Sequence, residues 1–138
     1  MIGLDTNVLA RYLAQDDTKQ AALATRLIEE ELTPTQQGFV SLVVVAELCW
    51  VLNSLYGATM DELVATIEDF LNTPQFCVEK REVLQAAIGR IKSKVAANSR
   101  KAGLADALIT EIAAGAGCTT TMTFDKTAVR AAGMTLLA

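Results

Sequence analysis

Histidine is absent from this chain, and its absence removes the most common general base and the most common ligand of transition metals. Neither a Ser-His-Asp nor a Cys-His catalytic arrangement can therefore be present. Proline is also scarce, at 2 of 138 residues, while 51% of the residues are hydrophobic and 20% are charged. This composition excludes disordered, collagen-like and low-complexity chains, and the length suits one domain. Any chemistry has to use carboxylates, Lys, Tyr, hydroxyls or thiols.

Cysteine is limited to Cys49, Cys77 and Cys118, which lie far apart in apolar runs and form no CxxC pattern. The sequence thus has neither a zinc-binding spacing nor a disulfide framework, and we expect buried, reduced thiols. The first residues lack the basic segment that opens a signal peptide, and the apolar run over residues 39–52 is too short to cross a bilayer. These absences predict a cytoplasmic protein without a membrane segment.

Short apolar segments alternate with segments of helical periodicity along the whole chain. We expect strands over residues 1–4, 38–41, 76–78, 119–124 and 134–137, and helices over about 6–13, 16–32, 42–55, 59–72, 83–95 and 104–114 and from 125, with a loop over 98–103. The helix over 104–114 is expected to be buried. This alternation predicts an α/β fold with a short, mostly parallel central sheet flanked by helices.

Four carboxylates stand out because of their apolar surroundings. Asp5 closes the first expected strand, and Asp125 closes the fourth. Glu47 is the only charged residue over residues 40–59, and Asp106 lies in an equally apolar segment. A carboxylate is costly to bury unless it is paired or binds a ligand, and these four acids are therefore candidate functional residues.

Each of these acids also has a structural interpretation. Asp5 and Asp125 precede helices and are suited to be N-caps. Asp106 falls in the first turn of a helix, where an acid complements the helix dipole. Glu47 is equally well explained by a buried ion pair with a base such as Arg11.

Taken together, the four acids favour a metal site. Ligands bind at the carboxyl ends of parallel strands, where Asp5 and Asp125 are expected, and flanking helices can bring Glu47 and Asp106 to the same edge. Four carboxylates without a cation would repel one another and raise each other's pKa values. Ligation by oxygen alone favours Mg²⁺ or Mn²⁺ over Zn²⁺.

The acids belong to short motifs that follow one another over nearly the whole chain. These are Leu4-Asp5-Thr6-Asn7-Val8-Leu9, Ala46-Glu47-Leu48, Leu104-Ala105-Asp106-Ala107-Leu108-Ile109, and Gly117-Cys118 leading to Thr123-Phe124-Asp125. In order and spacing they resemble the motifs of PIN-domain ribonucleases, and specifically of the VapC-type toxins of bacterial toxin–antitoxin modules. Two positions depart from the family pattern: Leu104 replaces a frequent aromatic residue, and residues 126–128 lack an acid and an aromatic residue often found there.

The resemblance implies a single PIN-like domain over residues 1–138. It implies that Asp5, Glu47, Asp106 and Asp125 are the catalytic residues and hold one or two Mg²⁺ or Mn²⁺ ions. Thr6, Asn7 and Thr123 would be supporting polar groups. Asp5 and Asp106 are the expected direct ligands, Glu47 a ligand or the group that positions the attacking water, and Asp125 a ligand, directly or through water.

The resemblance also implies an activity and partners. The protein would be a metal-dependent endoribonuclease that hydrolyses RNA phosphodiester bonds, the toxin of a VapBC-type pair. It would form a homodimer and bind a cognate VapB-like antitoxin. The stripe formed by Trp50, Leu52, Leu55 and Tyr56 is expected to be core, and a helical dimer face is the alternative.

Charge is distributed unevenly along the chain. The net charge is −4, but residues 80–101 carry seven basic residues against one acid, which is +6, whereas the remainder carries five against fifteen, which is −10. This basic stretch is either a solvated helix face or a contact for the phosphate backbone of RNA. Arg100 and Lys101 are the candidate substrate contacts, and Lys126 and Arg130 are weaker ones.

Two other functions compete with the ribonuclease. One is a non-catalytic PIN-like interaction module, which would have no reason to keep four unpaired acids. The other is a haloacid-dehalogenase-type phosphatase that uses Asp5 as its nucleophile. That chemistry expects a second acid where Asn7 stands, which disfavours it.

Overall fold

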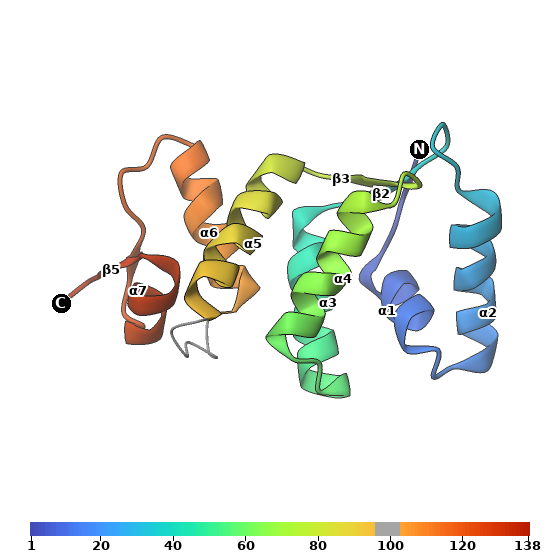
Figure 1. Ribbon diagram of the computed structural model, residues 1–138, viewed down its shortest axis with the longest axis horizontal. Coiled ribbons are helices and arrows are strands. Elements are labelled where there is room, and N and C mark those ends of the chain that lie inside the picture. The colour runs from blue at the N-terminus through green and yellow to red at the C-terminus, as the bar shows by residue number, and fades with distance from the viewer. Residues whose placement is uncertain (96–102) are drawn as a thin grey trace. The chain divides into compact units, whose positions relative to one another are not determined.

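The chain forms two compact units, which are described in turn. The computed structural model describes residues 1–95 and 103–138 (Figure 1). The first unit comprises Met1–Glu79 and the second Lys80–Ala138. None of the described helices is long and apolar enough to span a membrane.

The first unit is built on a three-stranded parallel sheet. Its strands are β1 (Ile2–Gly3), β2 (Gly38–Val40) and β3 (Phe76–Val78), in the order β1-β2-β3. Parallel strands end at the same edge of a sheet, so the residues that follow each strand share that edge. This edge is reached by Asp5, two residues after the end of β1, and by Ser41 and Glu79, which directly follow β2 and β3.

Some helices of the first unit begin or end at capping residues that are readable in the sequence. They are α1 (Thr6–Ala14), α2 (Thr18–Arg26), which continues as the π-helix η1 (Leu27–Glu31), α3 (Leu42–Tyr56) and α4 (Met60–Asn72). Asp17 accepts a hydrogen bond from the Gln20 amide at 2.9 Å at the start of α2. Gly57 ends α3 with a φ of 67°, a left-handed conformation that favours glycine.

A full capping box starts α4, as the sequence predicts. The Glu62 amide donates to the Thr59 hydroxyl at 3.2 Å, and the Thr59 amide donates to the Glu62 carboxylate at 3.0 Å. Hydrogen bonds to the Glu62 carboxylate from the Thr59 amide, and then from the Thr59 side chain, lower the pKa of Glu62 below its usual value, because they favour the ionised form.

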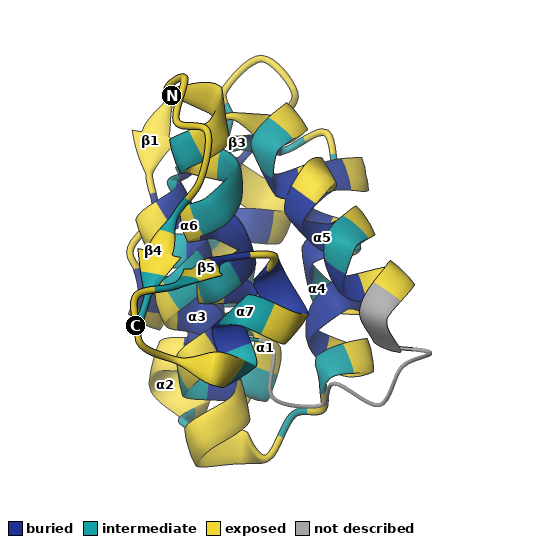
Figure 2. Ribbon diagram, turned by 90° about the vertical axis from the view of Figure 1, so that its left-hand side faces the viewer, coloured by how far each residue is buried: buried dark blue, intermediate teal, exposed yellow. Residues whose placement is uncertain are grey.

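The second unit contains α5 (Arg81–Val95), α6 (Leu104–Gly115), β4 (Met122–Thr123), α7 (Lys126–Ala132) and β5 (Thr135–Leu136). β4 and β5 pair in parallel, α5 packs on α6, and α7 contacts both helices. Figure 2 shows the two faces of α5, one buried and one exposed. The buried face carries Leu84, Ala87, Ile88 and Ile91.

The α/β fold with parallel strands is confirmed, and each predicted strand and helix is present among the described residues. Residues 98–102 of the predicted loop lie outside the described part of the chain. Several burial predictions are wrong, among them the expected burial of Cys118, which is exposed. Helix α6 is not buried all round, since Ile109 and Ile112 are exposed, and the stripe on α3 is core only at Leu52, since Trp50 is 66% exposed.

Candidate metal centre

Two of the predicted acids lie close together in the second unit. Asp106 is in the first turn of α6, after the N-cap Gly103, and Asp125 is the N-cap of α7, two residues after the end of β4. Burial, and then the negative charge of Asp125, raise the pKa of Asp106 above its usual value. A bound cation would relieve the unfavourable proximity of these two carboxylates.

The backbone around Asp125 holds its carboxylate in place. Asp125 Oδ1 accepts a hydrogen bond from the Thr127 amide at 2.8 Å, which confirms the N-cap interpretation. Thr123 Oγ1 accepts from the Asp125 amide at 3.0 Å, so this predicted supporting residue orients the acid through its backbone. The cap uses one carboxylate oxygen, and Oδ2 takes no part in that bond.

Asp5 behaves differently, although it too stands at a helix N-terminus. It occupies the N-cap position of α1 with an extended backbone, yet its side chain makes no capping hydrogen bond. The N-cap interpretation therefore does not account for this exposed carboxylate, which lies at the carboxyl edge of the three-stranded sheet. Ser41 provides the contrast at the same edge, because its hydroxyl caps α3 by accepting from the Val44 amide at 3.1 Å.

Thr6 places a buried hydroxyl directly after Asp5. The residue is 3% exposed, and its Oγ1 has no hydrogen-bond partner among the described residues. An unsatisfied buried hydroxyl costs free energy, and such a group in a native protein calls for a functional or structural partner. The chain holds this unsatisfied group beside an acid of the predicted site.

Glu47 corrects a prediction about burial. It lies on the exposed side of α3, together with Val43 and Trp50, while Val45 and Leu48 face the core. An apolar run therefore does not bury every residue of a helix, because only one face of α3 packs on the unit. The predicted ion pair between Glu47 and Arg11 is also wrong, since the Arg11 guanidinium lies 3.2 Å from Asp16.

Two structural charges were not singled out from the sequence. Glu79 follows β3, and its Oε1 accepts from the Leu42 amide at 2.9 Å, which satisfies the N-terminus of α3. The signal was available, since Glu79 comes directly after a predicted strand, as Asp5 and Asp125 do. Arg90 donates to Glu111 at 2.9 Å and to the Ala132 carbonyl at 3.2 Å. No local pattern marks this pair, because its partners are 21 and 42 residues away.

The basic stretch is described in part. Arg90 is taken up by its ion pair with Glu111 and so has a structural role. The predicted substrate contacts Arg100 and Lys101 lie outside the described residues. Lys126 and Arg130 are exposed on α7, the helix that Asp125 caps.

Asn7 lies at one end of a groove between α1 and α2. The groove has a volume of about 320 Å³ and an apolar floor that includes Leu23 and Leu27. Its polar lining comprises Asn7, Arg11 and Gln20, with Arg11 Nε donating to Gln20 Oε1 at 2.9 Å. Its polar and apolar parts are of the kind that contacts a nucleobase, which has polar edges and a flat face.

The donor set matches the chemistry of Mg²⁺ or Mn²⁺, since all four predicted ligands are carboxylates. Asp5 and Glu47 belong to the first unit, and Asp106 and Asp125 to the second. Within the described ranges, no three His, Cys, Asp or Glu side chains are grouped closely enough to hold a metal ion. Asp106 and Asp125 are thus the two predicted ligands that lie near each other within one unit. The set of four ligands stays a prediction.

Comparison with protein families identifies the class. A model of the PIN domain matches residues 2–134, and the chain belongs to the PIN-domain family. The match runs through both units. A comparison with curated proteins and one with solved structures found no match.

The PIN-domain family has a general function. PIN domains are usually nucleases, their fold is generally that of metal-dependent nucleases, and they generally bind RNA. The membership leaves the haloacid-dehalogenase alternative without support. It also agrees with a donor set made of carboxylates.

Proposed function

We propose that the protein is a Mg²⁺- or Mn²⁺-dependent endoribonuclease and the toxin of a VapBC-type pair. The observation that carries the proposal is the pair Asp106 and Asp125 in a chain of the PIN family, where burial and then the charge of Asp125 raise the pKa of Asp106. Acids held this close are stabilised by a bound cation. The free carboxylate of Asp5 and the exposed Glu47 supply the further oxygen ligands of the proposed site.

The residues of the chain have separate tasks in this reaction. Asp5, Asp106 and Asp125 hold the ion, and Thr123 fixes Asp125 through its amide. Glu47 orients a water molecule and accepts its proton. The bound ion would supply positive charge to the scissile phosphate and acidify that water. Attack at phosphorus in line with the departing 3′ oxygen breaks the P–O3′ bond and leaves a 5′-phosphate and a 3′-hydroxyl.

Substrate binding requires cations and a place for the bases. Lys126 and Arg130 on α7, together with Arg100 and Lys101, are the proposed contacts to the phosphate backbone. The groove beside Asn7 is the proposed contact for a base next to the cleaved bond.

Cleavage of RNA tests the enzymatic part of the proposal. We expect purified protein to cut a total RNA pool with Mg²⁺ or Mn²⁺, to leave 5′-phosphate ends on sequencing, and to stop when EDTA is added. Asp5→Asn and Asp106→Asn should each lower the rate by about a hundredfold or more, which corresponds to about 2.7 kcal/mol of transition-state stabilisation. Asp61→Asn, an exposed acid in the first turn of α4, is the matched control. Full activity in Asp5→Asn and Asp106→Asn would contradict the proposal.

RNA binding without any cleavage would instead identify an interaction module. Thermal unfolding of Asp106→Asn has to match that of the unmodified protein, so that lost activity is not mistaken for lost structure. An inhibitor that co-purifies with the protein could also abolish cleavage. Activity is therefore measured before and after denaturation and refolding, a treatment that removes such an inhibitor.

The toxin role and the partners need tests of their own. Induced expression in a bacterial host should arrest growth, Asp106→Asn should not, and co-expression of a VapB-like antitoxin should restore growth. We also propose a homodimer that uses the stripe of α3 formed by Trp50, Leu52, Leu55 and Tyr56, of which Trp50, Leu55 and Tyr56 are exposed. Light scattering should then give twice the mass of one chain, and Trp50→Ala should reduce it. The free thiols of the described residues support the proposed cytoplasmic location.

A further inference from the structure

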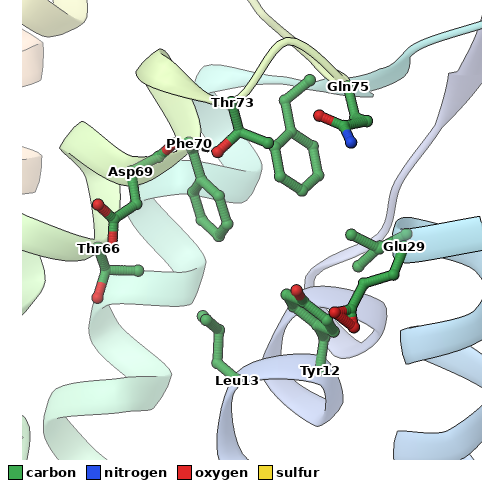
Figure 3. A pocket seen from close by; sticks show the side chains of 10 residues that line it. Tyr12, Leu13, Glu29, Thr66, Asp69, Phe70, Thr73 and Gln75 are labelled. Atoms are coloured by element: carbon green, nitrogen blue, oxygen red, sulfur yellow. Dashed lines mark hydrogen bonds between the residues drawn. The ribbon is translucent and has the colours of Figure 1, made fainter. Parts of the chain in front are cut away.

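A pocket of the first unit combines aromatic rings with carboxylates. It lies between α1, η1, α4 and β3 and has a volume of about 530 Å³, which is within the range of small-molecule sites. Phe70 and Phe76 form part of its wall, packed edge to face with 5.0 Å between ring centroids. Tyr12 and Leu13 of α1 also line it (Figure 3). The lining therefore combines aromatic and aliphatic side chains with polar ones.

Two carboxylates lie on different walls of this pocket. Figure 3 shows Asp69 on the side of α4 and Glu29 across the pocket, next to the Tyr12 ring. No Lys or Arg is present among the described residues that line it. The negative charges of Glu29 and Asp69 are thus not neutralised by a basic side chain among these lining residues.

The nearby bases do not neutralise these acids. Arg26, one turn before Glu29, lies 4.0 Å from Glu30 and 3.7 Å from Glu31. In the described part of the chain, neither Glu29 nor Asp69 takes part in an ion pair. Burial, and then the charge of Glu29, raise the pKa of the Tyr12 hydroxyl, so this carboxylate lies near one of the rings that line the pocket.

The ligand that matches this pocket has cationic ends and an apolar middle. Ammonium groups bind to carboxylates and over the faces of aromatic rings, and a methylene chain packs against Leu13 and the phenylalanines. We propose that this pocket binds an aliphatic diamine or polyamine, with its ammonium groups at Glu29 and Asp69. The site is separate from the acids of the proposed nuclease and does not depend on that activity.

Calorimetric titration with spermidine and putrescine tests this site. All titrations contain a constant excess of Mg²⁺, so that other acidic sites are occupied, and contain no RNA. We expect one ligand per chain, and a dissociation constant that rises at least about tenfold in Glu29→Gln and in Asp69→Asn. Glu31→Gln and Asp61→Asn remove the same charge from exposed positions outside the pocket lining and should change the constant by less than about twofold.

A variant that keeps the charge separates the pocket from general electrostatics. Thr66 lines the pocket, and Thr66→Leu should weaken binding by filling space while the net charge stays constant. Equal effects of Glu31→Gln and Glu29→Gln, or full binding by the Glu29→Gln/Asp69→Asn double variant, would overturn the proposal. The guanidinium of N-acetylarginine amide is titrated in parallel. Tighter binding of that compound than of spermidine would assign the same cation site to an arginine of a protein partner.

Discussion

Asp5 and Asp125 occupy the same position relative to a helix, yet their side chains do different things. Asp125 caps α7 through Oδ1, whereas Asp5 makes no capping bond at α1. An N-cap motif in a sequence predicts where a helix starts, and it does not reveal whether the carboxylate is used there. The carboxylate that is not used for capping is the stronger candidate for a ligand.

Thr6 allows a test at this scale. Thr6→Val removes an unsatisfied buried hydroxyl and keeps the shape of the side chain. We expect the free energy of unfolding to stay constant or to rise by up to about 1 kcal/mol, because no hydrogen bond to a described group is lost. Denaturant unfolding measures this change.

The same variant should lower RNA cleavage if the hydroxyl supports the acid beside it. Thr25→Val, at a half-buried threonine of α2 whose hydroxyl accepts a bond from Gln15, is the control. A clear loss of stability in Thr6→Val would show that its hydroxyl has a bonding partner in solution.

At the scale of elements, side-chain bonds between distant segments hold the helices of each unit. In the first unit, Asp16 accepts from Tyr56 at 2.5 Å and from Arg11 at 3.2 Å, which ties the residues after α1 to the end of α3. In the second unit, Arg90 ties α5 to α6 and to the end of α7. The periodicity of the sequence predicts each helix, but it does not predict these hydrogen bonds between distant segments.

The Asp16 network should make stability depend on pH. The Tyr56 hydroxyl, and after it Arg11, lower the pKa of Asp16 below its usual 3.8. A carboxyl whose pKa is lowered by folding stabilises the protein above its unfolded pKa, and this contribution is lost as pH falls through the folded pKa. Asp16→Asn should therefore be less stable than the unmodified protein near pH 7, and the difference should vanish at pH values below the lowered pKa. Chemical denaturation across this range measures it, and a difference that is constant with pH would contradict the assignment.

Arg90→Met should destabilise the second unit. Methionine keeps much of the length of the side chain, but it leaves Glu111 and the Ala132 carbonyl without their partner. We expect a loss of about 1–3 kcal/mol in the free energy of unfolding, as for other partly buried charged hydrogen bonds. Arg130→Met, at an exposed position of α7, should change it by less than about 0.5 kcal/mol.

Gly133 ends α7 next to the guanidinium of Arg90. A Cβ at this position would be 2.9 Å from the Arg90 guanidinium, and the backbone has a φ of 72°. The left-handed turn that ends α7 favours glycine here, and any other residue would also have to displace the end of the Arg90 side chain.

For the whole molecule, the central expectation is that a divalent cation stabilises the folded chain. A ligand that binds the folded state alone stabilises it by about 2.7 kcal/mol when its concentration is 100 times the dissociation constant. Mg²⁺ or Mn²⁺ should therefore raise the thermal midpoint, and EDTA should reverse the change. Asp106→Asn should abolish most of the increase, whereas Asp61→Asn should keep it. An equal increase in both variants would place the ion elsewhere.

The sequence by itself determined the order and kind of the elements. Cap residues such as Asp17, Thr59 and Gly57 act on their own turns, and the 3.6- and 2-residue periods are local properties. For the same reason Asp5, Glu47, Asp106 and Asp125 were recognisable as candidates, because each stands out against its immediate neighbours. The family match agrees with the fold class predicted in this way.

The tertiary structure decided which residues are exposed and what each charged group contacts. It placed Glu47 and Trp50 on the outer face of α3, paired Arg11 with Asp16, and put Asp125 close enough to Asp106 to raise its pKa. It also brought Glu29 and Asp69, 40 residues apart in the chain, to one aromatic pocket. Burial and pairing depend on contacts between segments distant in the chain, and such contacts leave no periodic trace in the local sequence.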